Sequence, residues 1–248
     1  MEIVSIDREY LLKRALTSKY IGKGTTSICF LQENGQVLKI YLPTPRKKLL
    51  FDAIDMKEHL TFLGEVSNEI FIGPNRIFLV DGKVGAVELE YVDAKTMAKI
   101  DPKTAISDLI SALHRIIFET YEISRNHLRL GDVHPRNVLF DKCFYIIDLD
   151  DGLNSQILTT DELFQVNISA IIYALLRAVF QIPPFHKFGF TDSELAEYYR
   201  LTITNNFQYY DNLFTYLGEI CNCDTPTIKD LRTIKKKILT EQPISRVR

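Results

Sequence analysis

The sequence predicts an α+β fold in which a sheet built from the first third of the chain is followed by helices. Short apolar runs separated by turn residues fill the first third, and later apolar residues recur at helical spacing. Strands followed by helices are typical of the α+β class. With 248 residues, of which 46% are hydrophobic, the chain can bury a sizeable core.

The sheet is predicted from two hairpins. Asn34-Gly35 between apolar runs is the strongest short signal for a β-hairpin. Asp81-Gly82 predicts a second hairpin, because both residues tolerate a positive φ. The predicted strands cover residues 20–24, 26–31, 36–42, 76–80 and 83–89, so we expect five antiparallel strands.

Helices are predicted between and after the strands. Apolar residues at mostly helical spacings predict a helix over about residues 46–70, although Gly64 weakens this prediction. A long amphipathic helix is expected to begin at Asp101 and Pro102. The remaining predictions are strands over residues 137–140 and 143–147 and mostly helical sequence from residue 161.

The charge balance argues against a general nucleic-acid-binding surface. Lysine and arginine total 30 and aspartate and glutamate total 32, so the formal net charge is −2. No apolar run approaches the roughly 18 to 20 residues of a membrane span, and the N-terminus is too charged for a signal peptide. Four cysteines, including Cys221 and Cys223, provide neither a disulfide framework nor a zinc ligand set. We therefore expect a soluble, cytoplasmic protein without nucleic-acid or membrane partners.

The first chemical motif is a glycine-rich turn followed by a strand lysine. Gly22 and Gly24 lie at a predicted strand-to-strand turn, and Lys39 follows within an apolar strand. Glycines without Cβ let backbone N–H groups approach a phosphate, and a lysine in the adjacent strand supplies positive charge. Such a turn is common by chance, so the phosphate interpretation needs support from elsewhere.

That support comes from a set of polar residues around the strands predicted over residues 137–140 and 143–147. Asp132, Asn137 and Asp148 provide two carboxylates and an amide at strand ends. Magnesium-dependent phosphoryl transfer requires such groups: one acid orients the attacking hydroxyl, and an acid and an amide oxygen hold hard Mg²⁺ ions. Each residue alone could instead make the hydrogen bonds of a turn. The three together favour phosphoryl transfer.

These motifs together resemble the protein-kinase-like superfamily over nearly the whole chain. The run from Gly22 to Ser27 resembles its glycine-rich loop, Val37-Leu-Lys39 its third strand, and Leu89-Glu-Tyr-Val92 its hinge. The resemblance implies a two-lobed fold. The N-lobe would cover residues 1–90, with a five-stranded antiparallel sheet and one long helix, and a mainly helical C-lobe would cover residues 91–248.

The resemblance also implies ATP and Mg²⁺ as cofactors and assigns roles to individual residues. Lys39 would contact the α and β phosphates, and Asp132 would be the catalytic acid. Asn137 and Asp148 would be the metal ligands. The nucleotide would be lined by Ile21, Gly22, Gly24, Ser27, Cys29, Val37 and Leu139, with the backbone of Glu90 and Val92 pairing with the adenine edge.

A helix glutamate that pairs with Lys39 is also expected from the resemblance. Glu65, ahead of the segment that ends at Pro74, is preferred to Glu58 and Glu69. The alternative is that Glu65 is an ordinary solvated helix acid, because glutamate is mostly exposed in proteins.

Three departures separate this chain from typical protein kinases. Leu130-Gly-Asp132 replaces His-Arg-Asp and Asp148-Leu-Asp150 replaces Asp-Phe-Gly, which is similar to aminoglycoside phosphotransferases and to RIO and ABC1 kinases. The segment after Asp148 is short and lacks Ala-Pro-Glu, so no extended platform for peptide substrates is expected.

We expect an atypical serine/threonine protein kinase that phosphorylates a folded protein, or itself on Ser155, Thr159 or Thr160. The interval between the hinge and Asp132 leaves no room for the helical insertion that encloses small substrates in aminoglycoside and choline kinases. A small-molecule kinase and a nucleotide-binding pseudokinase are the alternatives, and the pattern makes no prediction of the oligomeric state.

Overall fold

The computed structural model describes residues 1–43, 55–181, 225, 227–230 and 232–233. The chain divides into two compact units. The first unit comprises residues 1–93, 125–132 and 145–157, and the second comprises residues 94–124, 133–144 and 158–248. The start of the helix predicted over residues 46–70 lies outside the described residues, as do Cys221 and Cys223.

The first unit contains a six-stranded mixed sheet, so the predicted five-stranded antiparallel sheet is wrong in strand number and direction, although the α+β class is confirmed. In order across the sheet, the strands are β1 (Glu2–Ile6), β5 (Pro74–Val80), β6 (Lys83–Glu90), β4 (Gln36–Tyr41), β3 (Ser27–Leu31) and β2 (Lys19–Lys23). The five expected strands are antiparallel to one another, and β1 lies at one edge, parallel to β5. Parallel strands have no hairpin turn between them, so the local sequence contains no feature that predicts the pairing of β1 with β5.

Both predicted hairpin turns are confirmed. Gly35 has a φ of 77°, and Asp81 and Gly82 have φ values of 53° and 75°. These values lie in the left-handed region, which glycine, asparagine and aspartate tolerate best. The turns set the register of the β3–β4 and β5–β6 pairs and therefore the face of the sheet on which each side chain lies.

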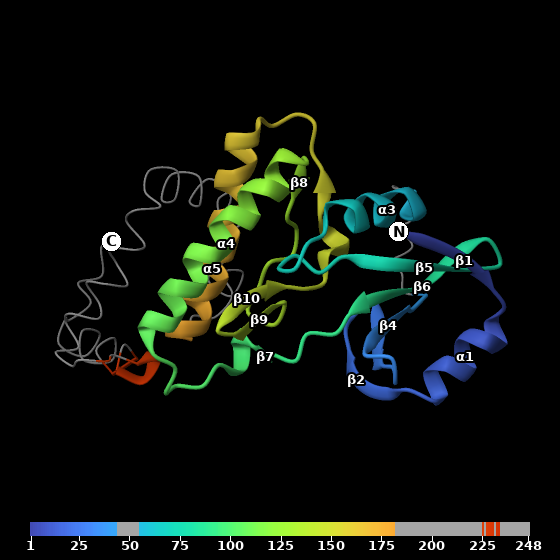
Figure 1. Ribbon diagram of the computed structural model, residues 1–248, viewed down its shortest axis with the longest axis horizontal. Helices are drawn as coiled ribbons and strands as arrows, with labels where there is room; N and C mark the ends of the chain where they lie inside the picture. Colours follow the sequence, from blue (N-terminus) through green and yellow to red (C-terminus); the bar gives the residue numbers. More distant parts are fainter. Residues whose placement is uncertain (44–54, 182–224, 226, 231, 234–248) are drawn as a thin grey trace, which may run out of the picture. The chain divides into compact units, whose positions relative to one another are not determined.

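Helices α1 (Arg8–Leu16) and α3 (Met56–Val66) flank the sheet on opposite faces (Figure 1). Leu11 of α1 packs in a buried cluster with Leu38, Phe78 and Ala86. Successive side chains of a strand point to opposite faces, so Lys39 lies on the face opposite Leu38. Lys39 therefore shares the face of the sheet that α3 covers.

Local polar side chains set both ends of α3. The Asp55 carboxylate accepts hydrogen bonds from the backbone N–H groups of Lys57 and Glu58, which caps the start of the helix. The helix ends at Val66 rather than at the predicted residue 70. The Asn68 side chain accepts hydrogen bonds from the backbone N–H groups of Ile70 and Phe71. This turn competes with continuation of the helix.

The longest elements of the second unit are helices. Its elements are β7 (Lys95–Thr96), η1 (Met97–Lys99), α4 (Ile106–Arg125) as far as Ser124, β9 (Val138–Asp141), the first two residues of β10 (Cys143–Ile146) and α5 (Thr160–Phe180). Strands β7, β9 and β10 form a three-stranded sheet. Helix α4 begins later than the predicted Asp101 and Pro102. Asp101 instead closes a turn, because its side chain accepts a hydrogen bond from the Lys103 N–H and its carbonyl accepts one from Thr104.

Helices α4 and α5 lie side by side (Figure 1). The Asn167 amide of α5 donates to the Ser124 hydroxyl at 3.0 Å, and the Tyr121 and Phe164 rings meet edge to face with centroids 5.7 Å apart. In the described part of the chain, α5 alone is long and apolar enough to cross a membrane by length and composition, and 56% of that stretch is buried inside the protein. Such burial, together with a buried asparagine, is typical of a core helix.

Candidate functional site

The predicted glycine-rich segment forms the hairpin between β2 and β3. The Gly24 N–H donates to the Ser27 carbonyl at 2.9 Å, which closes the turn, and a register shift between Tyr20 and Gly22 places Ile21 at an irregularity in β2. A Cβ at Gly22 would meet no atom within 4 Å, and one at Gly24 would meet only Ser27, at 3.8 Å or more. Neither glycine has a positive φ. Packing and backbone conformation therefore do not account for the choice of glycine at these two positions.

Lys39 is buried in the middle of β4, with 4% of its surface exposed. It is in register with Cys29 of β3 on one side and with Val87 of β6 on the other. Val37 and Tyr41 flank it on the same face, because side chains two apart on a strand point the same way. The alternation of β4 therefore places a charged side chain among apolar neighbours, where it requires a counter-charge.

Asp148 and Asp150 supply that counter-charge. The Lys39 ammonium pairs with Asp148, and it lies 2.8 Å from Asp150 Oδ2. Burial by itself lowers the pKa of Lys39, but the two carboxylates outweigh burial, and the pKa lies well above its usual value. Lys39 is therefore protonated at all physiological pH values.

The two carboxylates differ in their access to solvent. The Asp148 side chain is 46% exposed, whereas the Asp150 side chain is 22% exposed. Asp148 also has a left-handed backbone, with a φ of 62°, immediately before the short helix η2 (Leu149–Asp151). The turn at Asp148 thus allows both carboxylates of Asp148-Leu-Asp150 to reach the same ammonium.

Burial and this charged cluster together shift the pKa values of two neighbouring side chains, Tyr41 and Cys29. Burial raises the pKa of Tyr41 well above its usual value, and the nearby Asp150 carboxylate raises it further, so the phenol stays protonated. Burial also raises the pKa of the Cys29 thiol, which the Lys39 ammonium only partly offsets. Cys29 is therefore a neutral thiol beside Lys39, consistent with a lining role rather than a nucleophilic one.

The loop that carries Asp148 is fixed to the segment that follows α3. The Ile146 N–H donates to the Ile70 carbonyl at 2.8 Å, and the Ile146 carbonyl accepts from the Ile72 N–H at 2.9 Å. From α3 itself, His59 Nε2 lies 2.9 Å from the Asp150 carbonyl. A carbonyl can only accept, so His59 must donate from Nε2.

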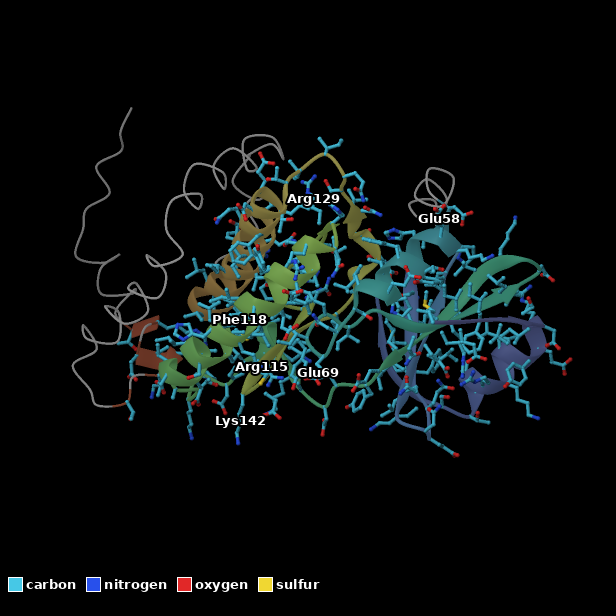
Figure 2. All side chains as sticks on the ribbon, turned by 45° about the horizontal axis from the view of Figure 1, so that its top comes forward. Glu58, Glu69, Arg115, Phe118, Arg129 and Lys142 are labelled. Atoms are coloured by element: carbon cyan, nitrogen blue, oxygen red, sulfur yellow. The ribbon has the colours of Figure 1, made fainter. Side chains whose placement is uncertain are left out.

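The predicted pair between Lys39 and Glu65 is not formed in the structure. Among the described residues, the ion-pair partners of Lys39 are Asp148 and Asp150. Glu65 is exposed on α3, as are the alternatives Glu58 on α3 and Glu69 after it. Figure 2 labels the side chains of Glu58 and Glu69. The buried face of α3 carries His59, Leu60 and Leu63 instead, so the helix presents its glutamates to solvent.

Asp132 belongs to the same unit as Lys39, Asp148 and Asp150. Strand β8 (Leu128–Arg129) pairs with β11 (Leu153–Asn154), which brings the segment before Asp132 against the segment after Asp150. At Gly131 the approach is closer still, because a Cβ there would overlap the Asp151 carbonyl and come within 2.8 Å of the Asp151 Cβ. Glycine at position 131 is thus required by packing. Asp132 itself is exposed.

The remaining predicted residues lie in the segment predicted to be a hinge and in the second unit. Residues 91–94 connect β6 to β7, and Glu90 pairs with Gln36 at the end of β6. Apart from bonds within helices and strands, the backbone of Val92 makes no hydrogen bond to the backbone of any described residue. Asn137 and Leu139 are buried in the second unit, where the Asn137 N–H donates to the His134 carbonyl at 2.8 Å. Their nucleotide and metal roles stay predictions.

Sequence analysis did not include Asp150, Tyr41 or His59 in the site. A signal existed for the first two: Tyr41 is two residues after Lys39 in a strand, and Asp150 is two residues after Asp148 in the same motif. His59 had no such signal, because its role depends on which face of α3 meets the sheet.

A metal site made of protein ligands alone is not found in the described residues, since no three His, Cys, Asp or Glu side chains there are grouped closely enough. Mg²⁺ in phosphoryl-transfer sites is held by one or two protein ligands together with substrate phosphates, so such a group is not required. No protein-family model matches this chain, and no curated protein matches its sequence. Function must therefore be inferred from the residues themselves.

Proposed function

We propose that this protein is a phosphotransferase that uses ATP and Mg²⁺, an atypical serine/threonine protein kinase with a two-lobed, kinase-like fold. The observation that carries the proposal is the ion pair between Lys39 and Asp148, which lie 109 residues apart in the chain. Separate sequence motifs predict these two residues for one phosphate and metal site. Their direct contact supports a shared function.

The charge of the cluster suits a divalent cation. Asp148 and Asp150 face a single ammonium, so the cluster formed with Lys39 carries a net negative charge. Asp148 offers a hard carboxylate oxygen that remains partly exposed, and Mg²⁺ prefers such ligands. Asp148 would hold Mg²⁺, which when bound would neutralise charge between the β and γ phosphates. Asn137, the other predicted metal ligand, belongs to the second unit.

The open glycine turn suits a phosphate chain. Nothing in the described part of the chain requires glycine at positions 22 and 24, and a side chain there would occupy open space above the turn. Backbone N–H groups without a Cβ can approach phosphate oxygens closely. Lys39 would then orient the phosphates, and Ile21, Cys29 and Val37 would line the adenine.

Asp132 is the proposed acid that orients the acceptor hydroxyl. Its side chain is exposed, and Gly131 holds its backbone against the loop that carries Asp148 and Asp150. An exposed carboxylate can accept a proton from a hydroxyl that a second molecule delivers. We propose a protein side chain in the cytoplasm as the acceptor.

The test is transfer of labelled γ-phosphate from ATP in the presence of Mg²⁺, with label in protein separated from label in small molecules. Asp132→Asn should lower the transfer rate by a factor of about 100 to 10,000, since a general base contributes about that much. The thermal shift on addition of ATP and Mg²⁺ should remain, because Asp132 is assigned to the acceptor. Asp108→Asn, at an exposed acid of α4, is the matched control. Absence of transfer from the wild-type protein to any acceptor would overturn the proposal.

A further inference from the structure

We propose that Asp150 is a positioning residue that anchors Lys39, in the place that the kinase resemblance gives to a glutamate of the helix after the lysine strand. This inference rests on the proposed function, because the position of Lys39 matters for catalysis only if Lys39 meets a phosphate. The anchoring itself can be tested without any catalytic measurement.

The different roles proposed for the two carboxylates follow from their different exposure to solvent. Asp148 and Asp150 both pair with Lys39, but Asp148 is about half exposed and Asp150 is mostly buried. A metal ion and its phosphate ligands arrive from solvent and meet the exposed carboxylate. With Asp148 holding a metal ion, Asp150 would still pair with Lys39 and keep the ammonium in place.

Two side chains adjoin Asp150. Tyr41, which lies on the same strand face as Lys39, is buried near the Asp150 carboxylate. His59 donates a hydrogen bond to the Asp150 backbone carbonyl at 2.9 Å. A side chain can orient another only if its own position is fixed, and the His59 hydrogen bond fixes the backbone of Asp150.

No carboxylate of α3 takes this role among the described residues. Glu58 and Glu65 are exposed, and the buried face of α3 meets the site through His59. The helix therefore acts on Lys39 indirectly, through the Asp150 backbone. This replaces a direct lysine–glutamate pair with a chain of three residues: His59, Asp150 and Lys39.

The test observes the Lys39 ammonium directly by two-dimensional ¹H–¹⁵N NMR of lysine side chains. Buried, ion-paired groups are protected from proton exchange with water, so the Lys39 signal should be visible in the wild-type protein. Its loss in Lys39→Arg assigns it. We expect Asp150→Asn to broaden or remove the signal, Asp150→Glu to restore it in part, and Glu65→Gln to leave it unchanged. Asp108→Asn is the control for an amide introduced at an exposed site.

Tyr41→Phe is the second variant, because it leaves Asp150 and its charge in place and so disturbs folding less than Asp150→Asn. It should weaken the Lys39 signal, since it removes the hydroxyl that lies near the Asp150 carboxylate. A sharp Lys39 signal in folded Asp150→Asn and in Tyr41→Phe would overturn the proposal. Loss of the signal in Glu65→Gln would also overturn it, because the helix glutamate would then be the anchor.

A kinetic measurement separates positioning from a purely structural role. Asp150→Asn should lower kcat/KM for ATP by about 100-fold, the order of loss expected when a reacting group is misplaced by about 1 Å. Asp150→Glu should recover at least about tenfold of that loss, whereas a variant that is only unstable would recover with lower temperature. If wild-type protein transfers no phosphate but its Lys39 signal depends on Asp150, the anchoring holds and the proposed function fails. If transfer occurs and the signal does not depend on Asp150, the function holds and the anchoring fails.

Discussion

Asp148 meets three requirements at once: it adopts a left-handed backbone, pairs with a buried lysine and leaves nearly half of its side chain exposed. Aspartate and asparagine are the residues other than glycine that tolerate the left-handed region best. A substitution of Asp148 by asparagine therefore preserves the backbone and removes only the charge. This makes Asp148 the sharpest single-residue test of the metal site.

We predict that Asp148→Asn abolishes phosphoryl transfer and the Mg²⁺-dependent part of the ATP thermal shift together. A neutral amide at this position binds a hard dication more weakly than a carboxylate does. Ligand binding raises the melting temperature more the tighter the ligand binds, so the increment that Mg²⁺ adds should disappear. Full turnover by this variant would show that Asp148 is not a metal ligand.

Two glycines that look alike in the sequence should respond differently to alanine. Gly131→Ala would drive a methyl group into the Asp151 carbonyl, and such overpacking costs about 1 to 3 kcal/mol of unfolding free energy. Gly22→Ala meets open space, so its stability should stay within about 0.5 kcal/mol of wild type. Its ATP-induced thermal shift should fall, because the methyl group would occupy the space proposed for phosphate. Denaturant unfolding with and without ATP distinguishes the two outcomes.

A buried glutamate joins α1 to the sheet. The Glu88 carboxylate of β6 pairs with Arg14 of α1, accepts a hydrogen bond from Gln32 at 2.8 Å, and lies 2.7 Å from Arg76 of β5. Burial alone would raise the pKa of Glu88, but the hydrogen bonds of Gln32 and Arg14, together with the arginine charges, outweigh burial and lower it. The network fixes one end of α1 against the sheet that carries Lys39.

We predict that Glu88→Gln destabilises the first unit by about 3 kcal/mol, the lower end for a broken buried ion pair, because Arg76 is partly exposed. A lowered folded-state pKa means that the ionised Glu88 stabilises the fold above its unfolded-state pKa and loses this effect as pH falls through the folded-state value. The stability difference between wild type and variant should therefore be constant near neutrality and shrink below about pH 4, near the ordinary pKa of glutamate. Urea unfolding at several pH values measures it, and a difference that grows in acid would contradict the prediction.

The segment between β11 and α5 exposes one of the hydroxyl groups predicted for self-modification. Ile157 is 94% exposed, and Thr159 is exposed at the N-cap of α5, where it shares a capping box with Glu162, whereas Ser155 and Thr160 are half-buried. The Thr159 hydroxyl is therefore accessible to a second molecule. The same exposure would serve a protein acceptor that docks from solution.

We predict that incubation with ATP and Mg²⁺ labels polypeptide, either this chain at Ser155, Thr159 or Thr160 or a protein in a cell lysate. Phosphate at Thr159 would compete with Glu162 for the helix cap, so the thermal stability of modified protein should change. Mass spectrometry of the protein alone and then with lysate measures the sites. Label confined to sugars, aminoglycosides or other metabolites would favour the small-molecule kinase instead.

The sequence by itself determined the strands and turns of residues 19–41 and 74–90. It also predicted that Lys39 and Asp148 belong to one site. These features depend on alternation and turn chemistry within a few residues, which a sequence shows directly. Only the tertiary structure decided that β1 joins the sheet in parallel, that Asp150 rather than Glu65 meets Lys39, and that Gly131 lies against Asp151. Each of these depends on which face an element turns toward a segment far away in the chain, and that choice is made by packing of the whole unit rather than by local sequence.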